Sequence, residues 1–164
     1  KRMLRMGILI HVRVARAPED MLDRLPPRKR RYYKRQALKV ANILNHKIMQ
    51  SLLKEIIESE HISLDKIEDI RVMIMPSIKD REYGDHLFGY YDPKECRISI
   101  YPAVKYKGSK FLTDPMVSFQ FIRESFDTLI HEVLHAKYSQ ESTVRKLTQK
   151  YLMEFYRMLQ EYLE

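Results

Sequence analysis

The sequence predicts an α+β domain: a small mixed β-sheet covered by a long backing helix, a later helix that carries candidate site residues, and a C-terminal helix. Short segments with apolar residues at every second position are followed by long segments with apolar residues at helical spacing. The predicted order of strand, helix, three strands and two helices favours two packed layers. No segment repeats, and the length of 164 residues suits a single domain, 1–164.

The first half of the chain is expected to start with a strand and continue into one long helix. Residues 6–14 alternate as in a half-buried strand, with one face formed by Ile8, Ile10, Val12 and Val14. Pro27 suits the first turn of a helix. Apolar residues then recur at helical spacing, at Ala37, Ala41, Leu44, Ile48, Leu52 and Ile56. We therefore expect one helix from Pro27 to about Glu58.

The second half is expected to contain three strands and two helices. Residues 69–76 alternate as a strand that Pro76 ends, and a hairpin is expected from about Leu87 to Tyr101 around the Asp92-Pro93 turn signal. Pro115 suits the first turn of a helix that runs to about Tyr138. A last helix is expected from near Glu141 to the C-terminus.

Composition narrows the class of protein. The single cysteine, Cys96, excludes an intramolecular disulfide and any four-cysteine metal cluster, so a metal site would use histidines and carboxylates. The apolar run near the start is interrupted by His11 and Arg13 before a signal-peptide core is complete, and no stretch reaches membrane-spanning length. These features predict a cytoplasmic protein without membrane contact.

A dense basic cluster lies at residues 28–35, where six of eight residues are Lys or Arg, in a chain of net charge +8. Such a cluster can dock on nucleic acid through phosphate contacts, with Tyr32 and Tyr33 available to stack on bases. It can equally be the solvated face of a helix, which is the commoner outcome for charge runs. The sequence leaves both interpretations open.

His131, Glu132 and His135 form the pattern HExxH inside the predicted 115–138 helix. Histidines four residues apart lie about 40° apart around a helix and one turn along it, so both imidazoles can bind one metal ion. Their face opposes the apolar residues of the helix, and Glu132 lies about 100° from His131. That position suits a general base for a metal-activated water, and one Zn²⁺ is the expected ion.

With this motif the chain resembles the zincin metallopeptidases, and its element order is most similar to the compact gluzincins, or minigluzincins. The resemblance implies that His131 and His135 are zinc ligands, Glu132 is the general base, and the third ligand is a glutamate on the next helix. Two glutamates fit that description. Glu141 follows His135 by six residues, whereas Glu154 lies about 20 Å further along the predicted last helix, so we favour Glu141.

The same resemblance implies that a peptide substrate binds as an added strand at the sheet edge above the metal. The segment "CRISIYP" (96–102) is the expected edge strand, and Gly89 is expected to allow close backbone approach. Four side chains are candidate donors to an oxyanion: His86, Tyr90, Tyr91 and Tyr138. Tyr138 is predicted on the face of the histidines, one turn past His135, which makes it a candidate catalytic residue.

The sequence therefore predicts a zinc-dependent peptidase acting on peptides or proteins, with metal ligands His131, His135 and Glu141. One alternative is a metal-dependent RNA hydrolase that resembles the bacterial rRNA-maturation endoribonucleases. Their motif has three histidines and lacks a glutamate after the first, so Glu132 favours the peptidase. A second alternative is a latent or non-catalytic metal-binding module that docks on nucleic acid through residues 28–35. No sequence feature fixes the oligomeric state.

Overall fold

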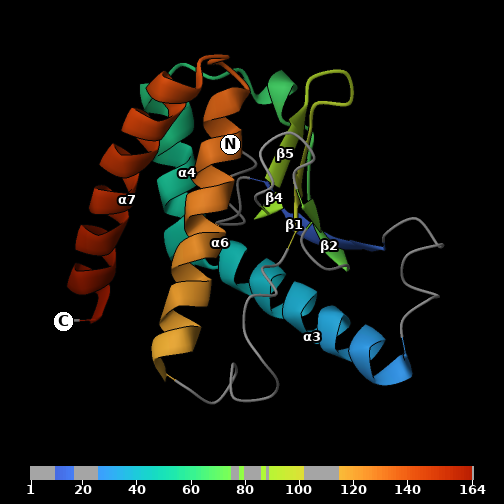
Figure 1. The fold of residues 1–164 in the computed structure, drawn as a ribbon. Coiled ribbons are helices and arrows are strands. Elements are labelled where there is room, and N and C mark those ends of the chain that lie inside the picture. Colours follow the sequence, from blue (N-terminus) through green and yellow to red (C-terminus); the bar gives the residue numbers. More distant parts are fainter. Residues whose placement is uncertain are drawn as a thin grey trace.

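The computed structural model of the protein describes residues 10–16, 26–74, 78–79, 86–87, 89–101 and 115–163 (Figure 1). Within them lies a mixed α/β fold with a four-stranded sheet: β1 (Val12–Arg16), β2 (Asp69–Ile74), β5 (Gly89–Asp92) and β6 (Arg97–Ile100). Four helices accompany it: α3 (Pro27–Leu44), α4 (Lys47–Ser59), α6 (Pro115–His135) and α7 (Glu141–Leu163). Smaller elements are the 3-10 helix η1 (Leu64–Lys66) and the paired strands β3 (Ile78–Lys79) and β4 (His86–Leu87).

The predicted mixed sheet and the predicted late helices are confirmed at this level. The hairpin expected from about Leu87 to Tyr101 is present as β5 and β6, which span 89–100 and are joined by the turn that begins at Pro93. Residues 6–9 of the predicted first strand and the expected strand end at Pro76 lie outside the described residues. Among the described helices, none is both long and apolar enough to cross a membrane.

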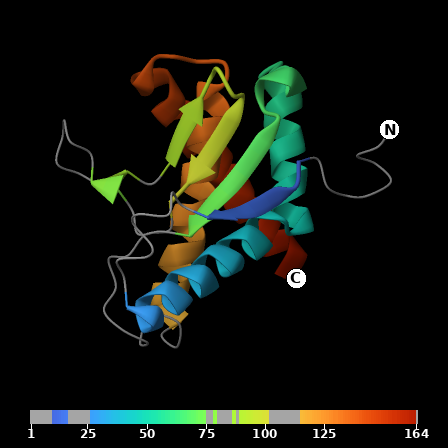
Figure 2. The same ribbon diagram turned by 90° about the vertical axis from the view of Figure 1, so that its right-hand side faces the viewer.

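The sheet has the strand order β1-β2-β6-β5, with β1, β2 and β6 parallel and β5 antiparallel to β6 (Figure 2). The inner strand β6 pairs with β2 on one side and with β5 on the other. The expectation that residues 96–102 form the edge strand was therefore wrong. A run of alternating apolar residues does not reveal which of two hairpin arms has a second neighbour. In the described part of the chain, the edge strands of this sheet are β5 and β1.

One face of the sheet is apolar and covered by helices. Cross-strand partners on this face form rows of fully buried side chains, such as Val12, Ile70 and Ile98. Helix α3 packs on β1 and β2, while α6 packs on β5 and β6. In the second row, Val72 and Ile100 are followed by Gly89 on the edge strand. Because Gly89 has no side chain, β5 can lie close to the part of α6 that carries the histidine motif.

The predicted single helix from Pro27 to Glu58 was wrong, because the chain leaves the helix at Asn45 and His46 and starts a second one. The Asn45 amide accepts a hydrogen bond from Val12 N at 2.7 Å and donates to Val12 O at 2.8 Å. Gln50 makes the same pair of contacts with the backbone of Ile10. The side-chain amides of Asn45 and Gln50 thus satisfy the backbone hydrogen-bonding groups of Val12 and Ile10 on the outer side of β1. A continuous helix would leave these groups unpaired.

Helix α6 is the centre of the core, because it packs between the sheet and α7. Four of its side chains are fully buried: Leu129, Ile130, Val133 and Leu134. On the α7 side, the rings of Phe126 and Phe155 lie 4.0 Å apart between centroids. Burial on two sides fixes the rotation of α6 about its axis. The remaining face, which carries His131 and His135, is directed to a partly open surface.

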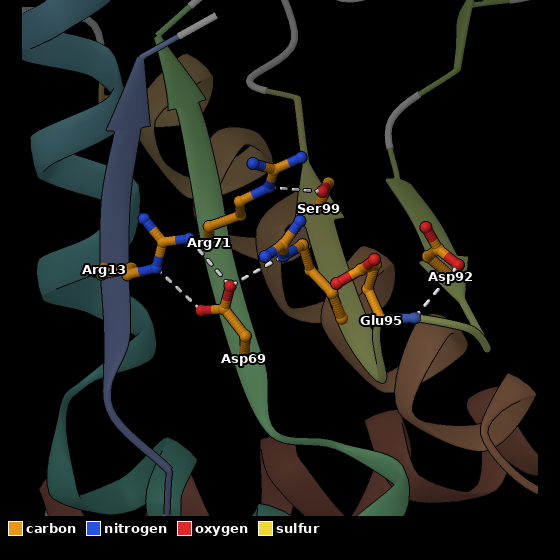
Figure 3. A network of polar contacts seen from close by, with 7 residues as sticks. Arg13, Asp69, Arg71, Asp92, Glu95 and Ser99 are labelled. Atoms are coloured by element: carbon orange, nitrogen blue, oxygen red, sulfur yellow. Dashed lines mark hydrogen bonds and ion pairs between the residues drawn. The ribbon is translucent and has the colours of Figure 1, made fainter.

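The outer face of the sheet carries an ion-pair network centred on Asp69 (Figure 3). The Asp69 carboxylate accepts two hydrogen bonds from Arg13 and one from Arg97, each at 2.8 Å. The hydrogen bonds from Arg13, opposed by burial and aided by Arg97, lower the pKa of Asp69 to about 2. Nearby, Arg71 donates to the Ser99 hydroxyl at 2.9 Å. The network joins the first three strands of the sheet across their outer surface.

We predict that Asp69→Asn destabilises the fold at neutral pH by about 1 to 2 kcal/mol, a value reduced for the partial exposure of the arginines. A depressed pKa means that the charged carboxylate stabilises the folded state above the ordinary pKa of 3.8. The difference between wild type and variant in the free energy of unfolding should therefore shrink as the pH falls from about 4 to about 2. Urea unfolding at several pH values measures it, with the exposed Asp65→Asn as control. A pH-independent difference would contradict the network.

Candidate metal centre

The turn between α6 and α7 brings the start of α7 back over the end of α6. Helix α6 ends at His135, where Tyr138 N donates to Leu134 O at 2.8 Å and Lys137 N donates to the same oxygen at 3.0 Å. Helix α7 begins at Glu141. The five residues between His135 and Glu141 reverse the direction of the chain. The Glu141 side chain therefore faces the last turn of α6.

Three side chains converge at this turn: His131, His135 and Glu141. The two Nε2 atoms of the histidines lie 3.1 Å apart. Glu141 places Oε1 2.8 Å from His131 Nε2 and Oε2 2.9 Å from His135 Nε2. The histidine side chains are 25% and 19% exposed, and Glu141 is 51% exposed. The cluster is thus fixed by α6 on one side and open to solvent on the other.

The donor atoms fit a small divalent cation. A tetrahedral zinc ion with bonds of about 2.0 to 2.1 Å separates its ligand atoms by about 3.3 Å. The separations of 2.8 to 3.1 Å approach that value, so an outward shift of a few tenths of an ångström would seat the ion. Two imidazoles and one carboxylate also match the three protein ligands of a catalytic zinc site, which keeps one position open for water. The residues therefore fit zinc.

The hydrogen bond made by the His135 ring also suits metal binding. Its Nδ1 atom lies 3.0 Å from the carbonyl oxygen of Tyr138. A carbonyl oxygen can only accept, so Nδ1 carries a hydrogen, and in the neutral ring Nε2 is then the atom that can bind a metal. At His131, burial lowers the pKa of the ring, although the Glu141 carboxylate opposes the shift. The neutral ring is the form that binds metals, so this shift at His131 favours metal binding.

Glu60, at the end of α4, anchors the turn that carries the cluster. Its carboxylate accepts hydrogen bonds from the hydroxyls of Tyr138 and Tyr151, and its backbone oxygen accepts one from Lys137. Burial opposes ionisation of Glu60, but the two tyrosine hydrogen bonds lower its pKa below the usual value. Through Tyr138, this contact fixes the carbonyl that orients His135. Sequence reasoning missed Glu60 because it lies 78 residues from Tyr138 and belongs to no motif.

Tyr138 was predicted as a candidate catalytic residue that donates to an oxyanion. The structure places its hydroxyl on Glu60 and its carbonyl on His135, so its contacts are those of a positioning residue. Of the other candidate donors, Tyr91 donates to the backbone oxygen of Lys66 at 2.8 Å, and Tyr90 is 51% exposed on the edge strand. The side chain of His86 lies outside the described residues.

Glu132 is a buried carboxyl, only 6% exposed, on the same helix as both histidines. Burial, together with the nearby charge of Glu141, raises the pKa of Glu132 to about 7. Edge strand β5 covers it at Gly89, where an added Cβ would lie 2.6 Å from Thr128 Cγ2 and 2.9 Å from Glu132 Cγ. Gly89 was expected to allow close backbone approach. Its neighbours are these two side chains of α6.

Of the two glutamates considered as third ligand, the structure brings Glu141 to the histidines and leaves Glu154 elsewhere. Glu154 lies beside Glu55 of α4, and the hydrogen bond between their carboxyl groups, together with burial, raises the pKa of Glu55. Position thus favours Glu141, and its role as the third ligand stays a prediction. The helical rise explains the difference in position, because thirteen residues of α7 carry Glu154 about 20 Å along the axis.

Comparison of the chain with protein-family models, with curated proteins and with solved structures finds no match in any of the three. The structure itself shows a mixed α/β protein in which His131, His135 and Glu141 can hold a metal ion.

We predict that the chain binds one equivalent of zinc, and that Glu141→Ala weakens binding by at least about 100-fold. Loss of an outer-shell partner alone typically costs 10- to 100-fold, so loss of a ligand should cost more. The matched control is Glu154→Ala, which removes the same side chain from the same helix and should leave the affinity unchanged. Competition with a chromophoric chelator measures both. Equal losses in the two variants would contradict the assigned ligand set.

We also predict that Gly89→Ala destabilises the fold by about 1 to 3 kcal/mol, because the added methyl group collides with Thr128 and Glu132. Chemical unfolding measures the change. Thr128→Ser removes the nearest colliding atom, Cγ2, so the double variant Gly89→Ala/Thr128→Ser should recover part of the loss. A Gly89→Ala variant as stable as wild type would show that β5 does not lie this close to α6.

Proposed function

We propose that the protein is a zinc-dependent peptidase in which Glu132 is the general base. One observation carries the proposal: the donor atoms of His131, His135 and Glu141 converge on one point beside a buried carboxyl on the same helix. The HExxH pattern and its resemblance to the zincin metallopeptidases support the same reading.

Each residue then has a defined task. His131, His135 and Glu141 hold the metal, and the Tyr138 carbonyl keeps the His135 ring oriented. When bound there, zinc supplies Lewis-acid polarisation of a water molecule and of the scissile carbonyl. Glu132 accepts the proton of that water as the water attacks, and delivers it to the amine that leaves. The buried position of Glu132 keeps competing bulk water away from this proton transfer.

The substrate is proposed to be a peptide or an unfolded protein segment that pairs with β5. No described strand occupies the outer side of β5, and this strand contacts α6 at Thr128 and Glu132. A peptide in extended form could add there through main-chain hydrogen bonds, which give affinity without strict sequence selection. Tyr90, exposed on β5, is available to contact its side chains.

The carboxylate at the third position favours this function over RNA hydrolysis. The endoribonucleases considered above use three histidines. In this chain the third residue of the cluster is Glu141, and a buried Glu132 follows the first histidine. A carboxylate ligand and a glutamate base are the groups expected for hydrolysis of an amide.

We predict that Glu132→Gln retains one equivalent of zinc and lowers cleavage of unfolded casein by about 10²- to 10⁴-fold, because the proton acceptor is lost while the ligands remain. Glu58→Gln, at an exposed position of α4, is the matched control and should retain full activity. Release of amino groups measures cleavage, and metal analysis measures occupancy. Unchanged cleavage by Glu132→Gln would reject the assigned base, and a zinc-loaded wild type without any cleavage would reject the peptidase.

A further inference from the structure

Almost all of the net positive charge of the protein resides on one helix. Helix α3 contains seven of the 30 Lys and Arg residues and none of the 22 Asp and Glu residues. The rest of the chain, with 23 basic and 22 acidic residues, has a net charge of only +1. The basic face of α3 consists of four exposed side chains in its first half: Arg28, Arg31, Lys34 and Arg35.

This arrangement opposes the stability of the helix itself. Arg28 with Arg31, and Arg31 with Arg35, are like charges at i,i+3 and i,i+4 spacing, each pair costing about 0.2 to 0.5 kcal/mol. The first turn contains basic residues and no acidic one, although a helix favours negative charge at this end. A solvated face selected only for solubility would be expected to mix both signs of charge.

No described side chain neutralises the basic face. Its four residues form no ion pair with any residue that the structure describes. On the sheet, by contrast, Arg13 and Arg97 share the carboxylate of Asp69. Pro27, Arg30, Arg31 and Lys34 also line a shallow surface hollow of ≈ 390 Å³. The basic face thus offers concentrated, uncompensated charge beside a hollow.

We propose that the basic face of α3 binds duplex nucleic acid through its phosphate backbone. From Arg28 to Arg35 the helix rises about 10.5 Å, and a duplex presents about six phosphate charges over that length of its axis. The four exposed residues of the basic face lie along this length, and each can contact one of these phosphates. Binding releases counterions and relieves the repulsion among the side chains of the face.

The packing of the neighbouring residues favours a duplex over a single strand or a membrane. Tyr33 is buried at 9% exposure, and the hydroxyl of Tyr32 accepts a hydrogen bond from Gln36. Neither ring is thus presented as an open platform on which unpaired bases stack. A membrane-surface helix needs an apolar face towards the lipid. The described exposed residues of α3 include one large apolar side chain, Leu38.

The basic face lies far from the candidate metal centre. Figures 1 and 2 show the start of α3 at one end of the molecule and the turn between α6 and α7 at the other. Bound nucleic acid would therefore leave the metal centre and β5 accessible. The proposed binding does not depend on the proposed peptidase, so each can fail without the other.

The test measures binding of the full chain to a labelled duplex of about 20 base pairs by fluorescence anisotropy between about 50 and 200 mM salt. The probes are one DNA and one RNA duplex. In the variant Arg28→Gln/Arg31→Gln/Arg35→Gln, the slope of log affinity against log salt should flatten by about 2.7. Wild-type affinity should consequently fall roughly 40-fold more than that of the variant over this range. Glutamine has a helix propensity close to that of arginine, so α3 should remain folded, which circular dichroism checks.

The matched control is Lys54→Gln/Lys146→Gln/Arg157→Gln, which removes the same charge from α4 and α7. It should bind with the wild-type salt slope. An equal loss in both triple variants would overturn the proposal, because net charge alone would then explain binding. The proposal also fails if wild type does not bind either duplex at about 50 mM salt. It fails equally if poly-glutamate, or vesicles containing phosphatidylserine, bind the basic face more tightly than the duplexes.

Discussion

Three groups that present lone pairs, the Nε2 atoms of His131 and His135 and the carboxylate of Glu141, lie within 3.1 Å of their neighbours. Each close contact needs a proton or a cation between its two atoms, because two lone pairs at this distance repel. A proton can satisfy one contact at a time, whereas a divalent cation satisfies all three. The short turn after His135 and the contact of Tyr138 with Glu60 position these side chains.

The rest of the fold positions Glu132 relative to these three side chains. Helix α6 is buried between the sheet and α7, so the rotation that directs the histidines outward also directs Glu132 against edge strand β5. Glu132 and the two histidines thus lie on adjacent faces of one helix, and edge strand β5 covers Glu132. Only glycine at position 89 lets the strand approach so closely. The basic face of α3 lies at the far end of the molecule, so its proposed binding of nucleic acid is independent of the metal centre.

The sequence predicted the histidine pair and Glu141 because their relation is local: helical spacing and a six-residue separation determine it. The mixed sheet and the two late helices followed from apolar periodicity. The break at Asn45 was missed because the apolar spacing continues across it, and its cause is a hydrogen bond to Val12, 33 residues earlier. The edge position of β5 and the anchor at Glu60 depend on contacts between distant segments, for which one sequence contains no local signal.

The most direct measurement is diffraction at the zinc absorption edge from crystals of the zinc-loaded chain. The account predicts one anomalous peak about 2.0 to 2.2 Å from the Nε2 atoms of His131 and His135 and from a carboxylate oxygen of Glu141. A fourth position should be open to solvent, with Glu132 beside it and outside the ligand set. A peak held by other residues, or rings of His131 and His135 that point apart with no metal between them, would contradict the account.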